Sequence, residues 1–218
     1  MESLYKAATP VQKAKGFDTN TKLNTDLAQQ LKHAGYQFCL RYISRSTAED
    51  PRDLTAEEVG DILEGGLALM PVQHVDRKGW TPNAALGKEY GAEAAAHARE
   101  VGFIPGINVW LDLEGVARGT TVDAVVDYAN AWNQELFAAG FVPGLYVGND
   151  SILNSDDLYQ KLSFHHYWKS LSQVPPVAQR GYQMIQVMGN ITCGIDLDED
   201  YVQPDNMGET VIWMVKNS

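Results

Sequence analysis

The chain has 218 residues, 44% of them hydrophobic and 10% aromatic, which is enough for one substantial core without disulfide or metal staples. Its net charge of −11, with no Lys/Arg cluster to offset it, argues against nucleic acid or an anionic membrane surface as a partner. No apolar run is long enough to span a bilayer, so membrane insertion is not expected.

The start of the chain lacks the basic-then-apolar profile of a secretory signal. We therefore expect a chain that stays in the cytoplasm, has lost a leader, or reaches the outside by non-classical export or lysis. Cys39 and Cys193 are the only cysteines, and their apolar-looking surroundings predict two buried free thiols. We assign residues 1–13 to an N-terminal tail and 14–218 to one domain.

Strand-like and helix-like segments alternate through the first two thirds of the chain. The expected strands are 14–18, 36–43, 67–75, 107–113 and 141–147, followed by the shorter candidates 165–170, 182–187 and 195–198. The expected helices run from Leu23 to Ala34, from a capping box at Thr55–Glu58 to Gly65, from about Asn83 to Val101, and from a cap at Thr120 or Thr121 to Gly140.

Eight strands with intervening helices predict a single compact (β/α)8 barrel of the TIM type, with reduced late helices. The alternative is an open, doubly wound sheet. No Gly-rich phosphate loop follows any expected strand, which argues against a nucleotide-dependent enzyme. The long helix at 83–101 carries a face of glycine and alanine, which predicts close packing against a neighbouring backbone.

The most informative segment is Val109–Gly115, where an apolar strand leads into Asp112 and Glu114. Side chains alternate along a strand, so both acids project from the same face. Two like charges beside an apolar run raise the pKa of at least one of them. A carboxylic acid that stays protonated near neutral pH can serve as the general acid in glycosidic bond cleavage. The same pair is also typical of solvated strand ends and structural ion pairs.

In a β/α barrel, the carboxyl ends of the strands meet at one mouth, where active sites lie. Asp18 ends the first expected strand, and the eighth strand, which carries Asp196, neighbours the first when the barrel closes. Among the clustered acids at that strand we expect only Asp196 to point inward. The predicted carboxylates around the mouth are Asp18, Asp112, Glu114 and Asp196. The further candidates for substrate contacts are Arg41, His74, Asp76, Trp80, Tyr146, Trp168 and Gln186.

Several of these residues also have structural interpretations. Asp18 lies among residues typical of a helix N-cap. Arg41, in the middle of a strand, needs a carboxylate partner, either in the acidic mouth or in an ion pair at the other end of the barrel. His74 is more often a hydrogen-bonded structural histidine than a base or ligand. The aromatic candidates would either stack on sugar rings or fill the barrel core.

An ordered set of motifs runs through residues 14–200. Its members are Gly16-Phe17-Asp18, Gly91–Ala95, Trp110–Glu114, Gly144-Leu145-Tyr146 and Gly194-Ile195-Asp196. With this set, the chain resembles the glycoside hydrolase-like domain of uncharacterised bacterial proteins, a domain related to the family-25 lysozymes (muramidases). The resemblance implies a modified β/α barrel that cleaves β-1,4 bonds after N-acetylmuramic acid in peptidoglycan, with no cofactor.

The resemblance also implies Glu114 as the proton donor. Asp112, Asp18 and Asp196 would support it by positioning the acetamido group or a water, or by stabilising positive charge at the anomeric carbon. The third strand, which ends in His74-Val75-Asp76, departs from the aromatic-rich end that the resemblance implies.

Two other functions stay open. One is a glycan-binding barrel without activity, and the other is a metal-dependent hydrolase that uses His74, Asp76 and the acids of the mouth. The expected partner is peptidoglycan or another glycan. The missing signal would suit a phage lysin or a delivered toxin, with any delivery or immunity partner unidentified.

Overall fold

The computed structural model describes residues 4–10, 13–46 and 50–217. In chain order, its elements are β1 (Tyr5–Ala8), β2 (Lys15–Thr19), α1 (Thr25–His33), β3 (Phe38–Ile43), α2 (Ala56–Glu64), β4 (Ala68–Gln73), α3 (Ala84–Glu100), β5 (Asn108–Leu113), α4 (Val122–Ala138), β6 (Val142–Val147), the π-helix η1 (Asp157–Lys161), β7 (His166–Lys169), β8 (Met184–Thr192), β9 (Ile195–Val202) and β10 (Trp213–Lys216). Within this described part, no helix combines the length and apolar character needed to cross a membrane.

Strands β2 to β9 close into a barrel, which confirms the predicted fold and excludes the open sheet. Strands β2 to β8 run parallel, each beside the one before it. The last barrel strand, β9, runs antiparallel to both β8 and β2, and Asp198 lies opposite Asp18. Because of this reversal, the start of β9 lies at the mouth, beside the carboxyl ends of the parallel strands.

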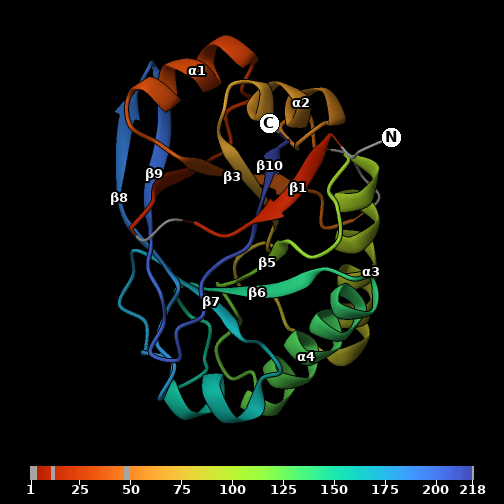
Figure 1. Cartoon of the computed structure of the whole chain (residues 1–218). Coiled ribbons are helices and arrows are strands. Elements are labelled where there is room, and N and C mark those ends of the chain that lie inside the picture. Colours follow the sequence, from red (N-terminus) through yellow and green to blue (C-terminus); the bar gives the residue numbers. More distant parts are fainter. Residues whose placement is uncertain (1–3, 11–12, 47–49, 218) are drawn as a thin grey trace.

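The helices lie around the outside of the barrel, with α3 and α4 on the side away from β8 and β9 (Figure 1). After β6 the helical layer thins, as predicted. The connection to β7 carries only the short η1, and no helix is assigned between β7 and β8. Strands β8 and β9 are joined directly as a hairpin.

The barrel interior is filled by large apolar side chains at alternate strand positions. Its members include Phe38, Leu40, Met70, Trp110, Trp168 and Met184. On β3, the inward side chains alternate with Cys39 and Arg41, which face the surrounding helices. A second, larger core fills the space between strands and helices.

The glycine and alanine face of α3 packs against α4, as predicted. A Cβ atom on Gly87 would lie 2.1 Å from the carbonyl oxygen of Tyr128, and one on Gly91 would lie 2.8 Å from that of Trp132. The two helix backbones are therefore in direct contact at these positions.

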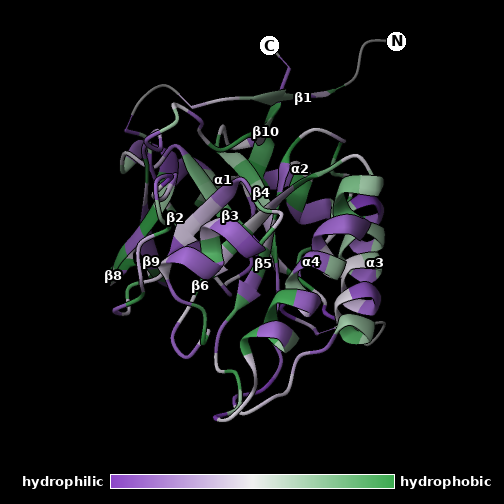
Figure 2. Ribbon diagram, turned by 90° about the horizontal axis from the view of Figure 1, so that it is seen from below, coloured by the Kyte–Doolittle hydropathy of each residue, from purple (hydrophilic) through white to green (hydrophobic). Residues whose placement is uncertain are grey.

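The sequence predicts no strand before residue 14, yet β1 pairs antiparallel with β10, with Tyr5 opposite Lys216. Strand β10 in turn meets β4, where Met214 lies opposite Leu69. Both strands lie beside the two chain ends (Figure 2). Trp213 on β10 packs on Phe38, with ring centroids 5.3 Å apart, and covers the end of the barrel opposite the mouth.

Strands β8 and β9 are longer than predicted, and their pairing continues past the mouth to Thr192 opposite Ile195. Cys193 lies in the turn of this hairpin with a φ of 52°. It is exposed, so the prediction that it is buried was wrong; a hairpin turn that projects from the barrel has no core to enter. Cys39 is a buried free thiol, as predicted.

Candidate active site

Three of the predicted acids meet inside the mouth. Asp18 on β2 and Asp112 on β5 are 4% and 7% exposed. Glu114 follows the end of β5 and is half-buried. The charges of Asp18 and Glu114 both act on Asp112, so the three carboxyl groups form one electrostatic cluster.

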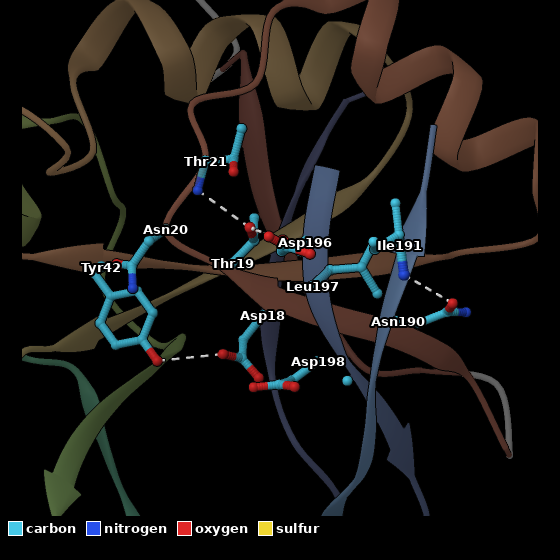
Figure 3. A pocket seen from close by; sticks show the side chains of 11 residues that line it. Asp18, Thr19, Asn20, Thr21, Tyr42, Asn190, Ile191, Asp196, Leu197 and Asp198 are labelled. Carbon is cyan, nitrogen blue, oxygen red and sulfur yellow. Dashed lines mark hydrogen bonds between the residues drawn. The ribbon is translucent and has the colours of Figure 1, made fainter. Parts of the chain in front are cut away.

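Asp18 is held by hydrogen bonds from the neighbouring strand β3 and from β8, which lies beyond β9. The hydroxyl of Tyr42 donates to its Oδ1 at 3.2 Å (Figure 3), and Nε2 of Gln186 donates to its Oδ2 at 2.7 Å. The Gln186 amide is itself oriented by the Tyr146 hydroxyl, which donates to its Oε1 at 3.0 Å. Burial raises the pKa of Asp18 and the nearby charge of Asp198 adds to this, while the bonds from Gln186 and Tyr42 oppose it.

Asp112 and Glu114 are both shifted toward the protonated form. Burial raises the pKa of Asp112 well above its ordinary value, and the charges of Glu114 and Asp18 add to this effect. The Oδ1 atom of Asp112 is buried and has no hydrogen-bond partner in the described part of the chain. Burial also raises the pKa of Glu114, against the opposing charge of Lys78. The mouth therefore holds carboxyl groups that keep a proton at higher pH than ordinary ones.

The backbone around Glu114 is fixed by the loop that follows β4. The indole Nε1 of Trp80 donates to the Glu114 carbonyl at 2.9 Å, and the Gly79 amide donates to the Gly115 carbonyl at 2.7 Å. Trp80 is only 6% exposed, and its ring packs edge-on against Tyr128. It is therefore placed to position Glu114, and its buried ring does not form an exposed surface for a sugar to stack on.

Asp198, and not Asp196, lies beside Asp18. Asp198 reaches toward the Asp18 carboxyl (Figure 3), and Nε2 of Gln186 lies 3.4 Å from its Oδ2. Asp196 is exposed at the rim, where its carbonyl accepts a hydrogen bond from the Thr19 hydroxyl at 2.7 Å. The prediction that only Asp196 points inward was wrong, because the antiparallel β9 carries the later acids deeper into the barrel.

A cavity of about 880 Å³ opens between Asp18 and the β8–β9 hairpin. Its lining consists of Asp18, Thr19, Asn20, Thr21, Tyr42, Gly189, Asn190, Ile191, Asp196, Leu197 and Asp198. Asp112 and Glu114 are not part of this lining and lie on the far side of Asp18. The hairpin thus adds a wall to one side of the mouth.

Arg41 does not face the mouth. Its Nε lies 2.7 Å from Oε1 of Glu58 on α2, and both side chains are buried. A second donor of Arg41 binds the Thr19 carbonyl at 2.7 Å. Of the two alternatives for its carboxylate partner, an acid of the mouth is excluded, and the ion pair is made with a helix outside the barrel. Arg41 ties β3 to α2 and to the end of β2 from outside the barrel.

Trp168 lies inside the barrel and is 1% exposed, so it fills the core and offers no face to a sugar. Its ring packs edge-on against Tyr146, with centroids 4.4 Å apart. Tyr146 lies above it, partly exposed at the mouth. Gln186 joins Tyr146 to Asp18 by hydrogen bonds, so Tyr146 is linked to the acids of the mouth.

His74 and Asp76 lie at the other edge of the mouth. The His74 ring stacks on Tyr42 with centroids 4.6 Å apart, and its Nε2 lies 2.8 Å from Oδ1 of Asp53. Asp76 lies 3.5 Å from the Arg45 guanidinium. Across the described residues, no three His, Cys, Asp or Glu side chains are arranged to hold a metal ion. The arrangement gives no support to a metal-dependent hydrolase that uses these two residues.

Three residues were missed from the sequence: Tyr42 and Asp198 at the mouth, and Asp200 in the barrel interior below it. Strand alternation could have identified Tyr42, since it shares the inward face of Phe38 and Leu40. Alternation also places Asp196, Asp198 and Asp200 on one face, but it does not say which of them enters the barrel.

A closed barrel with acids gathered at the carboxyl ends of its strands is the architecture of glycoside hydrolase-like barrels. A family model described as Rv2525c-like, glycoside hydrolase-like domain matches residues 29–202. The chain therefore belongs to this family, which confirms the resemblance recognised in its motifs.

Solved structures share the fold at low sequence identity. The Mycobacterium tuberculosis Tat-secreted protein Rv2525c, in complex with L-tartrate, matches with a TM-score of 0.66 and 14% identity, over 87% of this chain and 95% of that one. The modular autolysin LytC from Streptococcus pneumoniae gives 0.62 and 13%, over 87% of this chain and 46% of that one. The CTP1L endolysin gives 0.60 and 17%, over 87% and 66%. At these identities the likeness shows the fold alone. No curated protein sequence matches the chain.

Proposed function

We propose that this protein is a glycoside hydrolase that cleaves the glycan strands of bacterial peptidoglycan, with Glu114 as the general acid. The observation that carries the proposal is the half-buried carboxyl of Glu114, held at the barrel mouth beside the buried Asp112, with its pKa raised by burial. A carboxyl that retains its proton and still reaches the solvent can protonate a leaving glycosidic oxygen.

The other acids would stabilise the positive charge that develops at the anomeric carbon. Asp18 presents a carboxyl group whose orientation is fixed by Tyr42 and Gln186. Asp198 lies beside it and takes the place that Asp196 was expected to fill. Asp112 would hold the substrate's acetamido group or a water through the part of its carboxyl group that reaches the mouth, since the residue is 7% exposed. Asp196, at the rim, would contact more distant parts of the glycan.

The choice of substrate rests on the relatives. One structure of LytC is described as a complex with a synthetic peptidoglycan ligand, and CTP1L is described as an endolysin. The chain covers only 46% of LytC and 66% of CTP1L, so the additional parts of those proteins have no counterpart in it.

The test is the release of reducing ends and muropeptides from purified peptidoglycan. We expect the wild type to release them and Glu114→Gln to lower the rate by about 10²–10⁴-fold, the usual contribution of a general acid. Glu89→Gln, the same change at an exposed position of α3, should leave the rate unchanged.

The alternative of a glycan-binding barrel without activity makes a different prediction. Neither the wild type nor Glu114→Gln would then release products, and both would sediment with peptidoglycan to the same extent. That outcome would overturn the proposed hydrolysis and retain the glycan as ligand. Loss of both release and sedimentation would overturn both functions.

A further inference from the structure

Asp200 is the most deeply buried acid of the barrel, and the proposed reaction assigns it no role. It lies on β9 opposite Gly16 of β2 and Gln186 of β8, and its exposed fraction is 0%. Its Oδ1 accepts a hydrogen bond from Nε1 of Trp168 at 2.8 Å. Its Oδ2 is buried and has no hydrogen-bond partner in the described residues.

The groups that face Asp200 are acids and neutral side chains. Asp18 of β2 lies within hydrogen-bonding reach, and Asp198 of β9 also acts on it. Asp112 of β5 and Tyr146 of β6 are coupled to the same cluster. Tyr42 of β3 faces it through Asp18.

A buried carboxylate among other carboxylates, with no cation beside it, is costly to ionise. Burial, and then the charge of Asp18, raise the pKa of Asp200 well above its ordinary value. A protonated Asp200 carries a hydroxyl, and a buried hydroxyl needs an acceptor. The carboxyl of Asp18 is the acceptor within reach, whereas the Trp168 indole only donates.

A hydroxyl on Asp200 would add a third hydrogen-bond donor to the carboxyl group of Asp18. Tyr42 and Gln186 already donate to the two oxygens of Asp18. A flip of the Gln186 side-chain amide would break two hydrogen bonds, because its Oε1 accepts from both the Tyr146 hydroxyl and the Leu171 amide. With Asp200 as a third donor, the negative charge of Asp18 is held in one orientation without a cation.

We propose that Asp200 is a positioning residue that keeps its own proton in the barrel interior and donates a hydrogen bond to Asp18, so that Asp18 presents a carboxylate in a fixed orientation to the mouth. The effect on rate rests on the proposed hydrolase function. The hydrogen bond from a protonated Asp200 to Asp18 does not rest on that function, and the protonation of Asp200 can be measured without substrate.

The first experiment is a pH titration of the full chain, labelled with ¹³C at the aspartate carboxyl groups and followed by NMR. Asp200 should still be protonated at about pH 7, where an ordinary aspartate is ionised. In Asp18→Asn, the Asp200 signal should titrate at lower pH, because the neighbouring charge is gone. Ionisation of Asp200 at an ordinary pH, or a titration that Asp18→Asn leaves unchanged, would overturn the proposal.

The second experiment compares two variants in peptidoglycan hydrolysis. Asp200→Asn keeps a donor toward Asp18 and an acceptor for Trp168, and its kcat should stay within about threefold of wild type across the pH range. Asp200→Leu fills the space without a donor, and its kcat should fall at least about tenfold with KM little changed, as for a misplaced catalytic group.

Equal rates for Asp200→Leu and Asp200→Asn, with both folded by circular dichroism, would show that the donor is not needed and would overturn the proposal. If the wild type releases no products, the proposed hydrolysis fails, and the NMR titration alone decides whether Asp200 keeps its proton beside Asp18. The two failures are therefore distinguishable.

Discussion

At the scale of single residues, the mouth is organised by which side chains are kept away from water. Asp112 and Asp200 each have a buried oxygen without a hydrogen-bond partner among the described residues, while Glu114 stays half-buried. Burial is the largest cause of the raised pKa at each of the three. Glu114 differs because the charge of Lys78 opposes its shift, and because it reaches the solvent. The same physical effect thus acts on all three acids, and only Glu114, the acid of the proposed proton transfer, also reaches the solvent.

The position of Glu114 depends on a glycine at the end of the neighbouring strand, where Gly148 follows β6. A Cβ atom on Gly148 would lie 2.4 Å from Cβ of Glu114 and 2.7 Å from its Oε2. We expect Gly148→Ala to displace the Glu114 side chain and to lower muropeptide release by about 10²-fold, as a misplacement near 1 Å can do. Activity assays paired with thermal melts would check this. A wild-type rate in a folded Gly148→Ala protein would contradict it.

At the scale of elements, helix boundaries could be predicted because their signals are local. Thr55 and Thr121 cap α2 and α4, and their side chains accept from the amides of Glu58 and Ala124. The partner of the Glu58 side chain could not be predicted from the same pattern. A capping box would turn it back to its own helix, but it pairs instead with Arg41, a residue brought near only by the fold.

The close contact between α3 and α4 gives a test at this scale. In Gly87→Ala, the new methyl group would meet the Tyr128 carbonyl oxygen at 2.1 Å, and a backbone atom cannot turn aside. We expect the free energy of unfolding in urea to fall by about 1–3 kcal/mol, the usual cost of overpacking.

The matched control is Gly60→Ala in α2, where the nearest atom to the new methyl group is 4.0 Å away. Here the better helix propensity of alanine should raise the free energy of unfolding by up to about 1 kcal/mol. If both variants were stabilised alike, the two helices would be able to separate without cost, and their backbone contact would not matter for stability.

At the scale of the whole molecule, the barrel could be predicted because each strand and helix has its own period of hydrophobicity. The direction of β9 could not be predicted, because inward and outward side chains alternate in the same way whichever direction a strand runs. That single ambiguity accounts for the exchange of Asp196 for Asp198 at the mouth. Strands β1 and β10 were missed for another reason. They are short, and Ala8 and Trp213 become recognisable as partners only when the chain ends meet.

The whole molecule also carries two opposed sets of acids. Inside the barrel, the pKa of Asp18 is raised to about 7 by burial. Such a group binds its proton more tightly in the folded protein than in the unfolded chain. Its contribution to stability is therefore greatest below the pKa of the unfolded chain, near 4, and is lost as the pH rises to the pKa of the folded protein. Outside, the hydrogen bond from Lys15 lowers the pKa of Glu199, and that from Lys161 lowers the pKa of Asp157. These groups stabilise the folded protein at pH values above the pKa of the unfolded chain, and this stabilisation is lost as the pH falls.

Stability should therefore peak in mildly acidic solution, with a higher Tm at about pH 5 than at about pH 8. Asp18→Asn, which has no proton to gain, should lose part of this difference, because a tenfold gain in proton affinity on folding corresponds to about 1.4 kcal/mol. Glu89→Gln, on the exposed face of α3, should retain all of it. Thermal melts of the three proteins across this range decide the matter. If Asp18→Asn kept the full rise in Tm on acidification, the buried carboxyl group of Asp18 would not be the source of that rise. The source would then be the general decrease of negative charge on the surface.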